Sequence, residues 1–231
     1  MDANLIGARI FEEVKFAGGP PGDFDSSGRH TFIMALSCGL LPDHTFLDFG
    51  CGPLRLGFWF VRFLDPGKYY GLDPDKNFIE AGKKYALGDA VIAAKKPTFA
   101  VSRKCDMDRF GVKFDFVVAR SVFTHMMPAT VSQSLESFSK AASEGGIFLA
   151  SYWLPTFKQD GPIGDDPKHQ HDKRFLAVVK YSAEYLQELA KKYNLSARRV
   201  SPPTPSPNEQ EWMLFSRSEE RSQASSSAQS R

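Results

Sequence analysis

The sequence predicts an α/β protein: a mostly parallel, seven-stranded sheet with helices on both faces and an antiparallel pair of strands at its C-terminal end. Three observations support this fold. Short apolar segments alternate with helical patterns over residues 45–152, as in β-α-β units. Residues 114–119 form a continuous apolar run, as expected of a strand buried on both faces. A sharp glycine turn, at residues 50–52, follows the first expected strand.

The first 44 residues form a helical segment that precedes the sheet. A helix is expected over residues 5–16, followed by the loop Gly18-Gly19-Pro20-Pro21-Gly22. That loop could cover a site as a lid or serve only as a connection. A second helix is expected over residues 28–38, with Gly39 as its C-cap.

Residues 45–217 form the main domain, in which strands and helices alternate. Strands are expected at 45–49, 69–72, 98–101, 114–119 and 146–152, and helices at 54–64, 76–87 and 128–142. A helix at 182–193 and strands at 197–200 and 209–217 complete the domain, and the last two strands should pair antiparallel at one edge. The loop 155–175 is long, which in a compact domain favours a functional role such as a lid. Residues 218–231 are too polar to pack and are expected to be disordered.

Composition limits the class of protein. A chain of 231 residues with 42% hydrophobic residues can bury one sizeable core, and its 20 Phe predict an aromatic-rich one. The net charge of +2 argues against a general nucleic-acid binder, which usually carries a basic stripe. The three cysteines have neither disulfide nor zinc spacing. The N-terminus does not resemble a signal peptide, and no apolar run reaches the ~20 residues that span a bilayer, so a cytoplasmic protein without a membrane partner is expected.

The glycine turn predicts a nucleotide-like ligand. Gly50 and Gly52 can take positive φ and let a ligand approach the main chain closely. The helix after the turn directs its free N–H groups and its positive end into the same crevice. In a parallel sheet that crevice lies beyond the carboxyl ends of the strands. A dinucleotide would require a third glycine where Arg55 stands, which counts against an NAD-dependent oxidoreductase.

Four segments together resemble the class I S-adenosylmethionine-dependent methyltransferases, which have a Rossmann-like fold. They are Leu47-Asp48-Phe49-Gly50-Cys51-Gly52, the acid Asp73 after the second strand, Cys105-Asp106-Met107 after the third, and residues 114–125 through the fourth. The resemblance covers about residues 30–217. Within the family, Cys51-Gly52-Pro53-Leu54-Arg55 and Tyr69-Tyr70-Gly71-Leu72-Asp73-Pro74 are similar to bacterial small-molecule methyltransferases. The third glycine of the fuller family loop is replaced by Leu54.

The resemblance implies S-adenosyl-L-methionine as cofactor and places Asp106 and the Met107 main chain at the adenine. It also places Asp48, the glycine turn and the Arg120 main chain near the methionine portion. Asp73 lies 25 positions after Asp48, close to the spacing at which an acid meets ribose hydroxyls in such folds. The alternative for Asp73 is a simple turn or helix cap. The expected cofactor residues are Asp48, Gly50, Cys51, Gly52, Asp73, Pro74, Asp106, Met107 and Arg120.

Methyl transfer to an oxygen can use a general base, and His125 is the first candidate because it follows the fourth strand. It could equally be a structural histidine. The alternative bases are His30, His169 and His171, and Tyr152 and Trp153 are expected either as pocket walls or as edge packing. No metal site is predicted, although His169 and His171 could form a pair of ligands. The predicted activity is methyl transfer to a small molecule, such as a sugar hydroxyl, and the alternative is a non-catalytic cofactor-binding regulator. The oligomeric state is left open.

Overall fold

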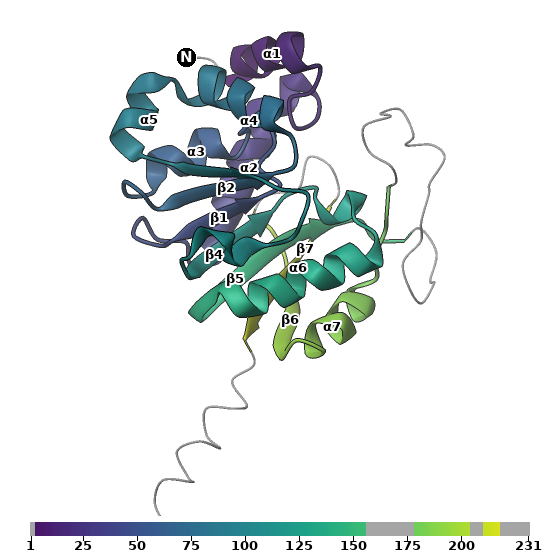
Figure 1. Cartoon of the computed structure of the whole chain (residues 1–231). Coiled ribbons are helices and arrows are strands. Elements are labelled where there is room, and N and C mark those ends of the chain that lie inside the picture. Colours follow the sequence, from purple (N-terminus) through teal and green to yellow (C-terminus); the bar gives the residue numbers. More distant parts are fainter. Residues whose placement is uncertain (1–2, 156–177, 204–209, 218–231) are drawn as a thin grey trace, which may run out of the picture.

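A computed structural model of the chain describes residues 3–155, 178–203 and 210–217. Its centre is a seven-stranded sheet with the order β3-β2-β1-β4-β5-β7-β6 (Figure 1). The strands are β1 Phe46–Phe49, β2 Tyr69–Asp73, β3 Thr98–Val101, β4 Phe114–Ala119, β5 Ala142–Tyr152, β6 Leu195–Val200 and β7 Glu211–Arg217. The pairs formed by β3, β2, β1, β4 and β5 are parallel, and β7 pairs antiparallel with both β5 and β6. The predicted fold class is therefore confirmed.

Helices cover both faces of the sheet, with α1 to α5 grouped on one side and α6 and α7 on the other (Figure 1). Their bounds are α1 Ala3–Val14, α2 Phe24–Ser37, α3 Gly57–Phe63, α4 Lys76–Gly82, α5 Asp89–Lys95, α6 Pro128–Ala141 and α7 Ala183–Lys191. Side chains alternate between the two faces along each strand. Phe46, Phe116 and Trp212 pack towards α1–α5, whereas Leu47, Val117 and Met213 pack towards α6 and α7.

The core is rich in aromatic rings, as the phenylalanine content predicts. Phe46 stacks on Phe60 of α3 with ring centroids 4.5 Å apart, and it also stacks on Tyr69 and Phe116 of the neighbouring strands. The N-terminal helices share this cluster, because Ile10 and other apolar residues of α1 and α2 pack into it. Residues 3–44 therefore pack on the same core as the sheet.

Several helix boundaries differ from the predictions; α2, for example, begins at Phe24, four residues earlier than expected. Two of the differences have a clear local cause. The helix expected over 54–64 begins at Gly57, because the chain first makes a tight turn in which Leu54 has a left-handed φ of 61°. The residues expected to form one helix over 76–87 form α4 and then a π-helical turn, Lys83–Leu87. Gly88, with φ of 76°, then starts the unpredicted α5. The C-cap of α2 is Cys38, one residue before the expected Gly39. Gly39 follows the cap with a left-handed φ of 93°, and its N–H donates to the Leu36 carbonyl at 3.0 Å.

Candidate functional site

The turn after β1 presents main chain without side chains at the carboxyl edge of the sheet. Gly50 and Gly52 have φ of 77° and 50°, in the left-handed region that favours glycine. The N–H groups of Gly50 and Cys51 donate to the Leu72 carbonyl at 2.8 and 3.1 Å and fix the turn to β2. A Cβ at Gly50 would lie 2.5 Å from Val122 Cγ2, whereas a Cβ at Gly52 would meet nothing within 4 Å. Gly50 is therefore needed for packing, and Gly52 leaves space for a ligand to reach the backbone.

The N–H groups of this turn already have acceptors. In addition to those of Gly50 and Cys51, the Gly52 N–H donates to Asp73 Oδ2 at 2.8 Å, and the Leu54 N–H donates to the Cys51 carbonyl at 3.1 Å. Pro53 has no N–H. A pyrophosphate at a helix N-terminus needs free N–H groups. The turn therefore does not suit a dinucleotide, which agrees with the missing third glycine.

Leu54, which replaces the third glycine of the methyltransferase loop, keeps its left-handed φ because its side chain is fully buried. A left-handed non-glycine residue costs about 1–2 kcal/mol. Burying a leucine side chain contributes about 1.5–3 kcal/mol, which offsets this cost. Two glycines provide the space, since a Cβ at Gly82 would lie 2.6 Å from Leu54 Cγ and one at Gly57 would lie 2.9 Å from Leu54 Cβ.

Asp73, at the end of β2, is held against the glycine turn. Its Oδ2 accepts from Gly52 N–H and its Oδ1 accepts from Asp75 N–H, both at 2.8 Å. Each carboxylate oxygen has a second acceptor position, so two hydroxyl groups of a ribose could also bind. The N-cap of α4 is Asp75, whose side chain accepts from Asn77 N–H at 2.8 Å. The capping role considered for Asp73 therefore belongs to Asp75. Burial raises the pKa of Asp73 to about 6.

Ser102, which the sequence analysis did not single out, connects Asp73 to Asp106. Its N–H donates to the Asp73 carbonyl at 3.0 Å, and its hydroxyl donates to Asp106 Oδ1 at 2.8 Å. The ends of β1, β2 and β3 are thus joined, as predicted. The Met107 N–H donates to Ser137 Oγ at 2.8 Å, so it is already used within the protein. The Met107 N–H is therefore not free for the adenine contact expected of this segment.

Asp48 does not face the space above the turn. It is 1% exposed, and its Oδ2 accepts from the Tyr69 hydroxyl at 2.7 Å. Burial raises the pKa of Asp48 to about 7, and the nearby Asp73 charge acts in the same direction. The geometry makes Asp48 a support beneath the turn. Pro74 is exposed next to Asp73, and Cys51 is buried, where burial raises the pKa of its thiol far above the usual value.

Arg120 follows β4 and reaches towards β5 and β7. Its Nη1 donates to Gln210 Oε1, and to Ser121 Oγ and Ser151 Oγ at 3.1 and 3.4 Å. Ser121 has a left-handed φ of 58°, and its N–H donates to Ser151 Oγ at 2.7 Å. Strained backbone of this kind is common at functional sites. The guanidinium lies over the Trp212 ring, 5.5 Å from its centroid.

The candidate bases lie at different depths. His125 ends a 3₁₀ turn, Phe123–His125, and is half-buried, whereas His30 on α2 is 6% exposed. Tyr152 is fully buried at the end of β5, and burial raises its pKa to about 12. Trp153, directly after it, is half-buried. The expected lid at 155–175, with His169 and His171, lies outside the described residues except for Pro155.

The N-terminal loop lies against the glycine turn through Arg55. The Arg55 side chain is 7% exposed, and its Nε and Nη2 donate to the Ala17 carbonyl at 3.2 and 3.1 Å. A Cβ at Gly19 would lie 2.6 Å from Arg55 Nη2. Phe16 also packs against Phe78 of α4, with ring centroids 4.9 Å apart. The loop is therefore anchored to the segments that flank the expected cofactor position.

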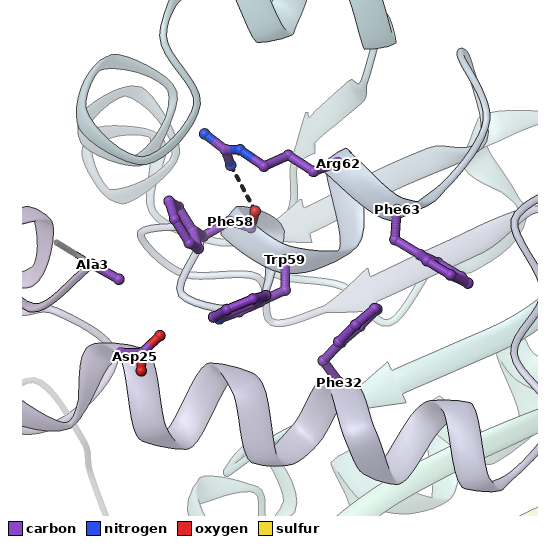
Figure 2. A pocket seen from close by; sticks show the side chains of 7 residues that line it. All are labelled: Ala3, Asp25, Phe32, Phe58, Trp59, Arg62 and Phe63. Carbon is purple, nitrogen blue, oxygen red and sulfur yellow. Dashed lines mark hydrogen bonds between the residues drawn. The ribbon is translucent and has the colours of Figure 1, made fainter. Parts of the chain in front are cut away.

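Two surface hollows lie on the side of α1–α5. One encloses about 410 Å³ between the end of α1 and the start of α4, next to Asp75 and therefore close to Asp73. The other encloses about 620 Å³ and lies between α2 and α3 (Figure 2). It is lined mainly by the aromatic rings of Phe32, Phe58, Trp59 and Phe63 (Figure 2). The Arg62 guanidinium lies over the Phe58 ring and donates to the Phe58 carbonyl at 2.6 Å (Figure 2).

Comparison with known proteins agrees with this geometry. Residues 47–148, from β1 into β5, match the family model of a methyltransferase domain. This part of the chain is therefore similar to methyltransferase domains. The matched segment contains the glycine turn, Asp73 and Asp106.

Solved structures with the same fold cover most of the chain. The chain is similar to magnesium protoporphyrin IX methyltransferase from Synechocystis PCC 6803 with bound SAH, at 16% identity and a TM-score of 0.62, over 92% of this chain and 93% of that one. DesVI from Streptomyces venezuelae matches at 16% identity and a TM-score of 0.59, over 85% and 92%. The glycopeptide N-methyltransferase MtfA, in complex with S-adenosylmethionine, matches at 12% identity and a TM-score of 0.62, over 84% and 95%.

In the described residues, no three His, Cys, Asp or Glu side chains are grouped so that they could hold a metal ion. The three cysteines are all free. Among the helices of the same residues, none is long and apolar enough to cross a membrane.

Proposed function

We propose that the protein transfers a methyl group from S-adenosylmethionine to a small molecule, with a hydroxyl group of a sugar or natural product as the acceptor class. One observation carries this proposal: within a methyltransferase domain, Asp73 is hydrogen-bonded to the main chain of Gly52, beside open space that a Cβ at Gly52 would enter. The structural relatives support a small-molecule acceptor, since one is named for a porphyrin and another for a glycopeptide.

The residues present fit the cofactor. Asp73 would accept hydrogen bonds from the ribose hydroxyls, because each of its oxygens has one acceptor position left. Asp106 would accept from the adenine amino group, and Ser102 holds that carboxylate in place. The main chain at Gly52 would lie against the methionine portion. Asp48 and Tyr69 support the turn from below and do not touch the ligand.

When bound, S-adenosylmethionine would supply an electrophilic methyl group, with S-adenosylhomocysteine as the leaving group. The protein's main contribution is to hold the acceptor in line with the methyl carbon, which in favourable cases lowers a barrier by about 7–11 kcal/mol. His125 is proposed to take the proton that an acceptor hydroxyl loses. A general base of this kind contributes typically about 10²–10⁴-fold.

Two measurements test the proposal. Titration calorimetry should detect S-adenosylhomocysteine binding with micromolar affinity, and the complete absence of heat and of thermal stabilisation would contradict the assignment. Transfer of a radiolabelled methyl group to a panel of sugars and other metabolites should then yield a labelled product. Cofactor binding without transfer to any member would favour the alternative, a cofactor-binding regulator of the same fold.

A further inference from the structure

Arg120 leaves one edge of its guanidinium unused. Nη1 is held by three oxygens, those of Gln210, Ser121 and Ser151. Nε and Nη2 are inaccessible to solvent and have no hydrogen-bond partner within the described residues. These two nitrogens form one edge of the guanidinium, the fork that binds both oxygens of a carboxylate or phosphate at once.

An unpaired buried cation is costly, and buried polar groups in native proteins almost always have partners. Arg120 is joined to no carboxylate by an ion pair in the described chain. A second buried cation, Arg55, lies close by, and its hydrogen bonds in the same residues go only to the uncharged Ala17 carbonyl. Burial, together with the charge of Arg55, lowers the pKa of Arg120 to about 10, so the guanidinium is still charged at neutral pH. The carboxylate of Asp23 acts on Arg55, but no carboxylate is paired with Arg120 in the described residues. The unused edge of Arg120 therefore indicates a place for an anionic ligand.

The position of Arg120 separates this place from the cofactor residues. In the sheet order, Asp73 and Asp106 follow β2 and β3 on one side of β1, whereas Arg120 follows β4 on the other side. Its Nη1 reaches Gln210, just before β7, which is two strands beyond β4. Neighbouring strands are about 4.8 Å apart, so β7 lies roughly 10 Å beyond β4, on the side away from the expected ribose site. The guanidinium therefore lies on the β4–β7 side of the sheet, away from the expected ribose site. This is the side on which the proposed acceptor would bind.

We propose that Arg120 binds a carboxylate or phosphate group of the methyl acceptor, so that the acceptor is an anionic small molecule. The inference rests on the proposed function and narrows its substrate class. Gln210, Ser121 and Ser151 act as positioning residues, because they fix Nη1 and thereby the direction of the free edge. The other source of the same chemistry is the carboxylate of the cofactor's methionine portion.

Inorganic phosphate is the probe for this site, and thermal unfolding is the measurement. With S-adenosylhomocysteine saturating and ionic strength fixed by NaCl, saturating phosphate should raise the unfolding midpoint of the wild type by about 5 °C. Arg120→Gln should abolish this increase. Arg29→Gln is the matched control, because Arg29 is an exposed arginine on α2 whose side chain is 56% exposed, and it should retain the full increase. Phosphate stabilisation that survives Arg120→Gln would overturn the proposal.

A second arm distinguishes the acceptor from the cofactor. Calorimetry of S-adenosylhomocysteine should give the same dissociation constant, within twofold, for wild type, Arg120→Gln and Arg120→Lys, with or without phosphate. Competition between phosphate and S-adenosylhomocysteine, or a tenfold loss of its affinity in Arg120→Gln, would assign the arginine to the cofactor and overturn the proposal. If S-adenosylhomocysteine does not bind the wild type at all, the proposed function itself fails, which is a different result. Circular dichroism of each variant establishes that it is folded.

Discussion

The two halves of the crevice differ in how their polar groups are satisfied. On the side of β1, β2 and β3, the main-chain N–H groups of the glycine turn have acceptors, and both oxygens of Asp73 accept backbone N–H groups. On the side of β4, β5 and β7, Arg120 Nε and Nη2, the Tyr152 hydroxyl and Trp212 Nε1 are buried without partners in the described residues.

The difference separates a rigid half from a half that is completed by a ligand. A site whose groups are held by the protein is formed before binding, so it loses little on association. Buried donors without acceptors are instead costly until something accepts from them. We therefore propose that the fold sets the half that binds the cofactor and that the other half determines which acceptor binds. The predictions below test each half, from the largest expected effect to the smallest.

Asp48, in the rigid half, should make the stability of the folded protein depend on pH. Its pKa is about 7 in the folded protein against 3.8 ordinarily, so the folded state holds the proton more tightly and stability falls as pH rises from about 4 to 7. The difference between these two pKa values, at about 1.36 kcal/mol per pKa unit, corresponds to a loss of at most about 4 kcal/mol in the free energy of unfolding. Asp48→Asn should therefore be more stable than wild type at pH 8 and equal to it near pH 4, as measured by urea denaturation. The exposed control Asp43→Asn should show no such crossover. A constant difference at all pH values would contradict the prediction.

Removing the Asp73 carboxylate should damage cofactor binding most. Asp73→Ala removes two charge-assisted hydrogen bonds to ribose, each worth about 1.5–3 kcal/mol, so the affinity for S-adenosylhomocysteine should fall about 10²–10⁴-fold. Calorimetry measures this change. Asp75→Ala is the matched control: it removes the N-cap of α4, costing about 1 kcal/mol of stability, and should leave affinity within a few-fold. Unchanged affinity in Asp73→Ala would remove the ribose assignment.

The two glycines of the turn should respond differently to a methyl group. Gly50→Ala places Cβ 2.5 Å from Val122, in addition to strain at positive φ, and should destabilise the protein by about 2–3 kcal/mol. Gly52→Ala meets only open space, so it should cost about 1 kcal/mol in stability yet weaken cofactor binding by at least tenfold. Urea denaturation and calorimetry on both variants separate the two effects. Equal losses of stability would show that the space above Gly52 is not open.

Much of the fold follows from local sequence patterns. The apolar runs predict β3 and β4 to the residue, and the alternation of strands and helices predicts the sheet. The sequence pattern ends the helix at residue 87 and does not reveal α5, which begins after Gly88 takes a positive φ of 76°. For the same reason the late start of α3 is not predicted, since Leu54 can adopt its left-handed conformation only where Gly57 and Gly82 make room.

The residues of the candidate site differ in how far the sequence predicts their roles. Asp73 and the glycine turn are predictable because each stands at a strand end with a recognisable neighbour. The side-chain role of Arg120 is not, because Gln210 lies 90 residues away in sequence and reaches it only when β7 inserts between β5 and β6. Ser102 was missed because a serine after a strand has no distinctive spacing. Asp48 was expected at the ligand, but its strand position turns it towards Tyr69.

The smallest predicted effect has an unusual sign. Arg120→Met removes a buried cation that lacks an anion while keeping a side chain of similar length, so the free energy of unfolding without ligand should rise by about 1 kcal/mol. Gln210 Oε1 would still accept from Ser151 Oγ at 2.7 Å, so the neighbouring network survives. Urea denaturation measures the change, and Arg29→Met, at an exposed position, should alter stability by less than about 0.5 kcal/mol. A loss of stability in Arg120→Met would mean that the guanidinium is a structural group satisfied within the protein, and the contrast between the two halves of the crevice would disappear.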